Sequence, residues 1–166
     1  MAMTSDDLFR LFETLDIPVR TYQHEPTFTV EEGRELKASM PGGHSKNLFM
    51  KDKARQLVLI SAEAQTKLKL NRLHNVIGTG RLSFASPELM VEHLGVQPGS
   101  VTAFALANDT GHHVRFILEK TLSDSDPMNL HPLRNDMTTA ISRADFDRFL
   151  AHTGHSCDVV DFSGLD

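Results

Sequence analysis

Residues 42–47 (GGHSKN) combine the residue types that bind phosphate or stabilise a developing oxyanion. Two flexible glycines lead directly into Lys46 and Asn47 at the mouth of an expected strand. Backbone amides, an ammonium and a side-chain amide are expected to converge there, and the lysine offers a point charge to a phosphate or a donor to an oxyanion. From the residues alone, a lysine that simply begins a strand in solvent is an equal alternative.

Residues 129–135 (NLHPLRN) form a second polar segment, centred on a histidine. Pro132 forces His131 into an extended conformation. The side chains of Asn129, His131 and Asn135 then compete for hydrogen bonds. This histidine can serve a binding site or bond to turn carbonyls, and the segment by itself leaves both interpretations open.

The histidine pairs that are close in sequence are poor candidates for metal ligands. His112 and His113 are expected on a strand, where neighbours point to opposite faces. His152 and His155 straddle the expected helix end at Gly154. We therefore interpret all four as polar surface residues.

Charge is unevenly distributed along the chain. The whole protein has a net charge of −5, yet residues 46–81 carry eight basic and two acidic side chains, which leaves −11 for the rest. A local basic stretch on an acidic body suits limited contact with a polyanion. A solvated face of alternating strands is the simpler alternative, and broad binding of duplex DNA is not expected.

Length and composition indicate one globular domain over residues 1–166, with 40% hydrophobic and 23% charged residues. The single cysteine, Cys157, excludes an intramolecular disulfide and any Cys-clustered zinc site. No stretch approaches the roughly 20 apolar residues that span a bilayer. The N-terminal sequence lacks the layout of a signal peptide, so we expect a cytoplasmic protein without a membrane partner.

Periodicity and turn signals predict an α+β fold with a mixed, curved sheet and helices packed around it. The first predicted helix has Leu8, Leu11, Phe12 and Leu15 on one face, and Thr4 or Ser5 can cap it. The other predicted helices are 30–37, 87–94, which ends at Gly95, and one that Ser142 caps before the helix end at Gly154. The predicted strands are 19–24, 47–51, 56–62, 81–85, 101–106, 114–119, 138–141 and 158–162. We expect hairpins at 47–62 and 101–119.

Five motifs in order make the chain similar to a known family. They are GGHSKNLFMKDK at 42–53, GRLSFAS at 80–86, LGVQPGSVT at 94–102, HPLRN at 131–135 and the closing GH…VVDF at 154–162. Together they resemble the YbaK/prolyl-tRNA synthetase editing-domain superfamily, and within it the free-standing ProX/PrdX type that hydrolyses Ala-tRNA(Pro). The resemblance covers nearly the whole chain and implies a barrel-like mixed sheet surrounded by helices.

The resemblance also implies an activity and its residues. Alanine wrongly esterified to tRNA(Pro) would be removed by a positioned water, with no metal and no cofactor. Lys46 matches the motif lysine that holds the terminal adenosine and phosphates, and Asn47 matches its neighbour in the site. His131 matches the histidine that lines the aminoacyl pocket, and the turn at Gly99 matches the one that positions ester and water.

Further residues follow from the same resemblance or from the charge pattern. Ser100, Thr102 and Asn129 are expected to bind substrate, and Phe28 and Val30 to wall a pocket that admits alanine and rejects larger residues. Ala103 stands where the family has proline. The expected path of the tRNA acceptor end follows basic side chains: Lys51, Lys53, Lys67, Lys69 and Arg72.

Two other functions stay open at this point. One is a non-catalytic tRNA-binding, nucleic-acid-binding or regulatory domain of the same fold. The other is an editor of a different mischarged tRNA. A helix-turn-helix protein that binds duplex DNA is disfavoured, because strands separate the predicted helices.

Overall fold

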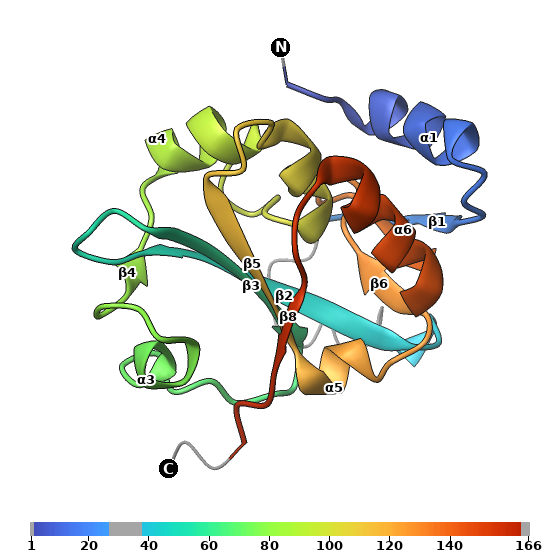
Figure 1. Cartoon of the computed structure of the whole chain (residues 1–166). Coiled ribbons are helices and arrows are strands. Elements are labelled where there is room, and N and C mark those ends of the chain that lie inside the picture. The colour runs from blue at the N-terminus through green and yellow to red at the C-terminus, as the bar shows by residue number, and fades with distance from the viewer. Residues whose placement is uncertain (1, 27–37, 164–166) are drawn as a thin grey trace.

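A computed structural model describes residues 2–26 and 38–163, and within them eight strands form one mixed sheet (Figure 1). The order across the sheet is β1-β7-β6-β2-β3-β5-β8, and β4 pairs with β2. The strands are β1 (Arg20–Gln23), β2 (Gly43–Lys51), β3 (Leu57–Glu63), β4 (Ser83–Phe84), β5 (Val114–Glu119), β6 (Met128–Leu130), β7 (Met137–Ile141) and β8 (Asp158–Val160). The predicted mixed sheet surrounded by helices is confirmed.

Helices lie around this sheet and also between its strands along the chain. They are α1 (Ser5–Thr14), α3 (Leu73–Ile77), α4 (Pro87–Leu89), the π-helix η1 (Met90–Leu94), the 3-10 helix η2 (Ala103–Asn108), α5 (Lys120–Ser123) and α6 (Arg143–Thr153). None of the helices among the described residues combines the length and the apolar character needed to cross a membrane.

Strand β2 is the central element, because it has partners on both edges. It forms the predicted antiparallel hairpin with β3, with Lys46 opposite Ala62. Its other edge pairs with β6, in parallel, at Gly43 and His44, and with β4 at Met50 and Lys51. The hairpin prediction is confirmed, although β2 begins at Gly43 and so takes in most of the glycine-rich segment.

The two faces of the sheet pack against different apolar clusters. Phe49 joins the larger cluster, to which α1, η2 and α6 contribute the edge-to-face and tilted rings of Phe12, Phe104 and Phe149. Its neighbour Met50 joins a smaller cluster with residues of α3. Successive strand residues point to opposite faces, so Phe49 and Met50 anchor β2 in the two clusters on either side of the sheet.

Cap residues explain where several helices begin and end. Thr4 and Asp7 form a reciprocal capping box at α1, and the Ser142 side chain accepts the amide of Asp145 at α6. Gly95 and Gly154 end η1 and α6 in the left-handed conformation that glycine adopts without strain. These boundaries agree with the sequence prediction.

One predicted strand is wrong, and with it the second predicted hairpin. Residues 103–108 form the 3-10 helix η2, which begins where the Thr102 side chain accepts the amide of Phe104 at 3.4 Å. A short, fully buried apolar run has no periodicity that distinguishes a strand from a helix. The N-cap at Thr102 favours the helix. The predicted helix at 30–37 lies outside the described residues.

Candidate active site

Lys46 lies in the middle of β2 and is half-buried. Its ammonium donates to the backbone carbonyl of Thr66, in the segment that follows β3. Thr66 is held in turn by Glu119, whose Oε1 accepts the threonine hydroxyl at 3.2 Å. The lysine is therefore a positioned side chain, and the alternative of a lysine that extends into solvent does not hold.

Glu119 anchors this arrangement, and the sequence analysis did not identify it. Burial raises the pKa of Glu119, but hydrogen bonds from the amides of Glu63, Thr121 and Leu122 and the Thr121 side chain lower it further, so the pKa lies below its ordinary value. Glu119 thus stays ionised while only 2% exposed. A glutamate that ends an apolar strand directly before a helix is the available sequence signal, because its carboxylate can cap that helix.

Asn47 points to the opposite face of β2 from Lys46, as neighbours in a regular strand must. Its side-chain oxygen accepts the hydroxyl of buried Ser61, the facing residue of β3. The expected convergence of the lysine and asparagine side chains is therefore wrong. The regular register with β3 leaves no bulge that would turn both side chains to one side.

The backbone of Asn47, unlike its side chain, does face the gap between β6 and β4. Gly43 donates its amide to Pro127, and the carbonyl of Phe49 accepts from Ala85, so both direct their backbone groups to this edge. Backbone direction alternates along a strand, so Ser45 and Asn47 direct theirs to the same edge. No described strand pairs with β2 there between His44 and Met50.

Asn129 lies beside this gap, on β6 and opposite His44. It is 2% exposed, and both hydrogens of its amide group are used, by the carbonyls of Pro41 and Gly43, each at 3.0 Å. These two carbonyls fix the orientation of the amide. Its oxygen, Oδ1, has no hydrogen-bond partner among the described residues, so this buried acceptor is unpaired there.

His131 follows β6 directly, two residues beyond Asn129, just as Lys46 lies two residues beyond His44 on the neighbouring strand. Equal offsets along paired strands bring equivalent positions to the same face. The structure thus brings Lys46, Asn129 and His131 to one face of the sheet. His131 Nδ1 donates to the carbonyl of Met137 at 2.8 Å, which fixes the orientation of the ring.

A second histidine, missed by the sequence analysis, lies next to His131. The rings of His24 and His131 are 6.3 Å apart, and His24 Nε2 bonds to the Thr138 hydroxyl at 2.8 Å. His24 also lines a hollow of about 510 Å³, whose wall includes Met137 and the ion pair of Arg134 and Asp136. The hollow therefore adjoins His131 through Met137.

The predicted glycine turn forms, but its residues differ in what they can contact. Gly99 is exposed with φ of +93°, and the backbone amide of Ser100 donates to the backbone carbonyl of Gln97 at 3.0 Å. Thr102 is fully buried and caps η2, which gives its hydroxyl a structural task. Ala103, where the family has proline, is buried as the first residue of η2.

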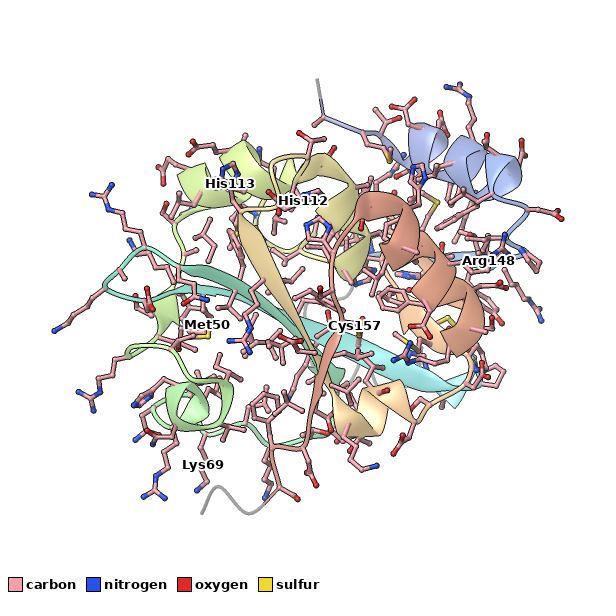
Figure 2. All side chains as sticks on the ribbon, viewed as in Figure 1. Met50, Lys69, His112, His113, Arg148 and Cys157 are labelled. Carbon is pink, nitrogen blue, oxygen red and sulfur yellow. The ribbon has the colours of Figure 1, made fainter. Side chains whose placement is uncertain are left out.

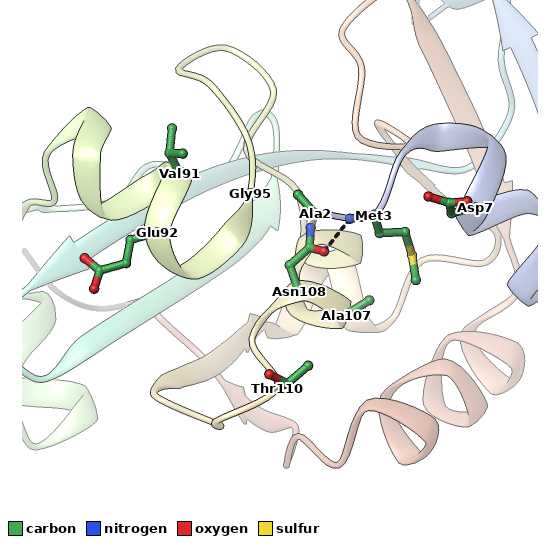
Figure 3. A pocket seen from close by; sticks show the side chains of 9 residues that line it. All are labelled: Ala2, Met3, Asp7, Val91, Glu92, Gly95, Ala107, Asn108 and Thr110. Atoms are coloured by element: carbon green, nitrogen blue, oxygen red, sulfur yellow. Dashed lines mark hydrogen bonds between the residues drawn. The ribbon is translucent and has the colours of Figure 1, made fainter.

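The remaining predicted residues divide into three groups. Phe28 and Val30 lie outside the described residues. Lys51 and Lys53 lie at the β2–β3 turn, the first half-buried and the second exposed. Lys67, Lys69 and Arg72 are exposed along the segment before α3, where Figure 2 shows Lys69 at the periphery of the molecule. The basic stretch is therefore divided between the β2–β3 turn and the segment before α3.

Comparison with known proteins finds similarity to an aminoacyl-tRNA editing domain and to proteins named for prolyl-tRNA. A family model described as an aminoacyl-tRNA editing domain matches residues 24–149. The chain is 34% identical over 161 residues to "Prolyl-tRNA synthetase associated domain-containing protein 1" of Xenopus laevis, covering 94% of this chain and 95% of the relative. It is 29% identical over 150 residues to "Prolyl-tRNA editing protein ProX" of Acetoanaerobium sticklandii, covering 90% and 92%.

The fold has solved counterparts as well. A crystal structure described as "a putative trans-editing enzyme for prolyl tRNA synthetase" superposes with a TM-score of 0.69 at 16% identity. The match covers 97% of this chain and 98% of the other. At that identity the likeness bears on the fold.

Proposed function

This chain belongs to the aminoacyl-tRNA editing domain family, and from that premise we propose that it edits prolyl-tRNA by hydrolysing the ester of mischarged Ala-tRNA(Pro). The relative from Acetoanaerobium sticklandii is named a prolyl-tRNA editing protein. The observation that carries the proposal is the position of Lys46, on the same face as His131 and beside an edge of β2 that no described strand covers.

Hydrolysis of an aminoacyl ester needs little beyond orientation and charge stabilisation, because the ester is already activated. Water adds to the carbonyl carbon, and the tetrahedral intermediate carries its negative charge on the former carbonyl oxygen. The ribose oxygen then leaves with a proton, and the products are alanine and deacylated tRNA. No nucleophilic side chain is required.

The residues take separate roles in this proposal. The Lys46 ammonium has three N–H donors, of which Thr66 takes one, so two remain for a phosphate of the terminal adenosine or for the oxyanion. The backbone amide of Asn47, which faces the gap between β6 and β4, is proposed as a second donor. His131 lines the aminoacyl group, and the Gly99 turn contributes backbone groups.

Selection of alanine over proline is proposed to be steric, with Phe28 and Val30 as walls of the pocket. A pocket excludes a residue that is too large more sharply than it discriminates against one that is too small. Ala103, in place of the family's proline, is expected to affect rate and selectivity rather than the type of reaction.

The test is deacylation of tRNA charged with alanine, proline, serine or cysteine. We expect hydrolysis of Ala-tRNA(Pro) and sparing of Pro-tRNA(Pro). Lys46→Ala should lower kcat/KM by at least about 100-fold, the usual effect of losing one oxyanion donor. Lys120→Ala is the matched control, because the Lys120 ammonium pairs with Asp124 at 2.8 Å outside the proposed site.

Equal rates for wild type, Lys46→Ala and Lys120→Ala would refute the proposed site. Intact Ala-tRNA(Pro) combined with saturable tRNA binding would indicate a non-catalytic binding domain. A preference for serine or cysteine would identify an editor of another mischarged tRNA.

A further inference from the structure

Histidines from separate segments meet beside the turn that leads into β5. His93 belongs to η1, and His113 lies directly before β5, where Figure 2 labels it next to His112. Between them lies Asp109, which is 2% exposed at the end of η2. The chain separates these three residues by up to 20 positions, so no spacing motif reveals the group.

The donor atoms of the three side chains are close enough to share one ion. One ligand atom from each lies within 4.8 Å of the others. His113 Nδ1 is 3.7 Å from Asp109 Oδ1, and the rings of His93 and His113 are 5.4 Å apart. Tetrahedral zinc with ligands at about 2.0–2.1 Å brings its donors to about 3.4 Å from one another. The His113 side chain, 65% exposed, can make the required rotation.

Hydrogen bonds hold the Asp109 carboxylate in a fixed orientation, as an anionic metal ligand requires. Its Oδ2 accepts the Val114 amide at 2.8 Å and His155 Nε2 at 2.9 Å, whereas Oδ1 accepts the His113 amide at 3.0 Å and faces the His113 ring. Burial raises the pKa of Asp109, but hydrogen bonds from His155, Val114 and His113 lower it further, to below its ordinary value. A carboxylate oriented by a second histidine is the outer-shell arrangement found around protein-bound metals.

The group is open to solvent on one side. His93 and His113 line a hollow of about 410 Å³ together with Glu92, whose Oε2 is 3.9 Å from His93 Nε2. Lys51 and Arg55 line the same hollow. The carboxylates of Asp109 and Glu92 offset these two cations, so the hollow does not repel a divalent ion through its net charge.

We propose that His93, Asp109 and His113 form a binding site for one divalent transition-metal ion of the zinc class, with Glu92 or water as the fourth ligand. Two imidazoles and a carboxylate suit zinc and its transition-metal neighbours, whereas calcium and magnesium prefer an all-oxygen shell. The bound ion joins η1 to the segment before β5. The three ligands are not among the residues proposed for editing, although Lys51 lines the hollow and also lies on the expected tRNA path. The metal site does not depend on the proposed deacylation.

The experiment is calorimetric titration of tag-free, chelator-stripped protein with ZnCl2, supported by the visible absorption of Co²⁺ as a probe of geometry. We expect one equivalent of Zn²⁺ to bind, an intense tetrahedral Co²⁺ band, and a higher unfolding temperature with Zn²⁺. His93→Ala and His113→Ala should each weaken binding by at least about tenfold, and His155→Gln should do so by about tenfold through the outer shell.

The control is His152→Ala, which removes an exposed histidine of α6 outside the group and should bind like wild type. Circular dichroism of each variant without metal establishes that the fold is retained. Equal affinity in wild type, His93→Ala and His113→Ala would overturn the proposal, as would no measurable binding of Zn²⁺ to the wild type at 100-fold excess over protein.

Discussion

Asn129 and Asp109 are equally buried, each 2% exposed, but their hydrogen bonding is opposite in character. Both oxygens of Asp109 have partners, and these partners hold the turn before β5. Asn129 donates twice to neighbouring carbonyls, and no donor within residues 2–26 and 38–163 reaches its Oδ1. An unmade hydrogen bond of a buried group costs about 1–3 kcal/mol, so a donor that reaches Oδ1 of Asn129 would recover that cost.

The contrast separates a region whose buried hydrogen bonds are made within the described residues from a region that leaves one buried acceptor unpaired there. Around Asp109 every carboxylate contact comes from the chain itself. Asn129 has an unpaired buried acceptor and lies on the same face of the sheet as Lys46 and His131, next to an edge of β2 that no described strand covers. Substitutions in the first region should act on folding, and substitutions in the second on catalysis.

The largest effect on stability is expected for Asp109→Ala. It leaves the amides of His113 and Val114 and the ring of His155 without their acceptor, and such losses cost about 3–5 kcal/mol. Urea unfolding in the presence of EDTA measures the change. The deacylation rate per folded molecule should stay at the wild-type value. A loss of activity that exceeds the loss of folded protein would contradict the view that Asp109 acts on folding rather than on catalysis.

A smaller effect, on activity rather than stability, is expected for Asn129→Ala. The substitution removes two donors but also the unpartnered Oδ1, so the free energy of unfolding should fall by less than about 2 kcal/mol. We expect kcat/KM for Ala-tRNA(Pro) to fall by about tenfold. Unchanged kinetics with a large loss of stability would show that Asn129 is merely structural.

The smallest effect is a pH dependence of stability that Asp109 contributes. Its pKa in the folded state lies below the ordinary value of 3.8. The carboxylate therefore adds stability above the unfolded-state pKa, and this stability is lost as pH falls through the lower, folded-state pKa. Urea unfolding from pH 6 to pH 3 should show a steeper decline for wild type than for Asp109→Asn, and parallel curves would contradict the assignment.

Local signals predicted much of the fold. Thr4, Ser142, Gly95 and Gly154 mark helix ends through backbone hydrogen bonds within a few residues, so the sequence alone locates them. The strand predicted at 101–106 is wrong, and η2 forms at 103–108 instead, because a buried apolar run has no polar face to reveal its period. The short strand β6 depends on pairing with β2 and β7, which no local pattern encodes.

The candidate site was predictable to a similar extent. The motifs indicated Lys46 and His131, and the structure brings both to one face. That the Asn47 side chain points away follows from the strand register, and the contributions of Glu119 and His24 depend on contacts between residues more than 50 positions apart. Such long-range pairs are set by topology and have no signature in the neighbouring sequence.

The alternation of backbone direction along β2 has a consequence for amide hydrogen exchange. The amides of Lys46 and Leu48 point into the ladder with β3, whereas those of Ser45 and Asn47 point to the edge without a described partner strand. Protection against exchange with deuterated solvent should therefore alternate residue by residue along this strand. Binding of a deacylated tRNA 3′ end should slow exchange at Asn47 while leaving Lys46 as slow as before, which turns a single pair of neighbouring amides into an internal reporter of occupancy.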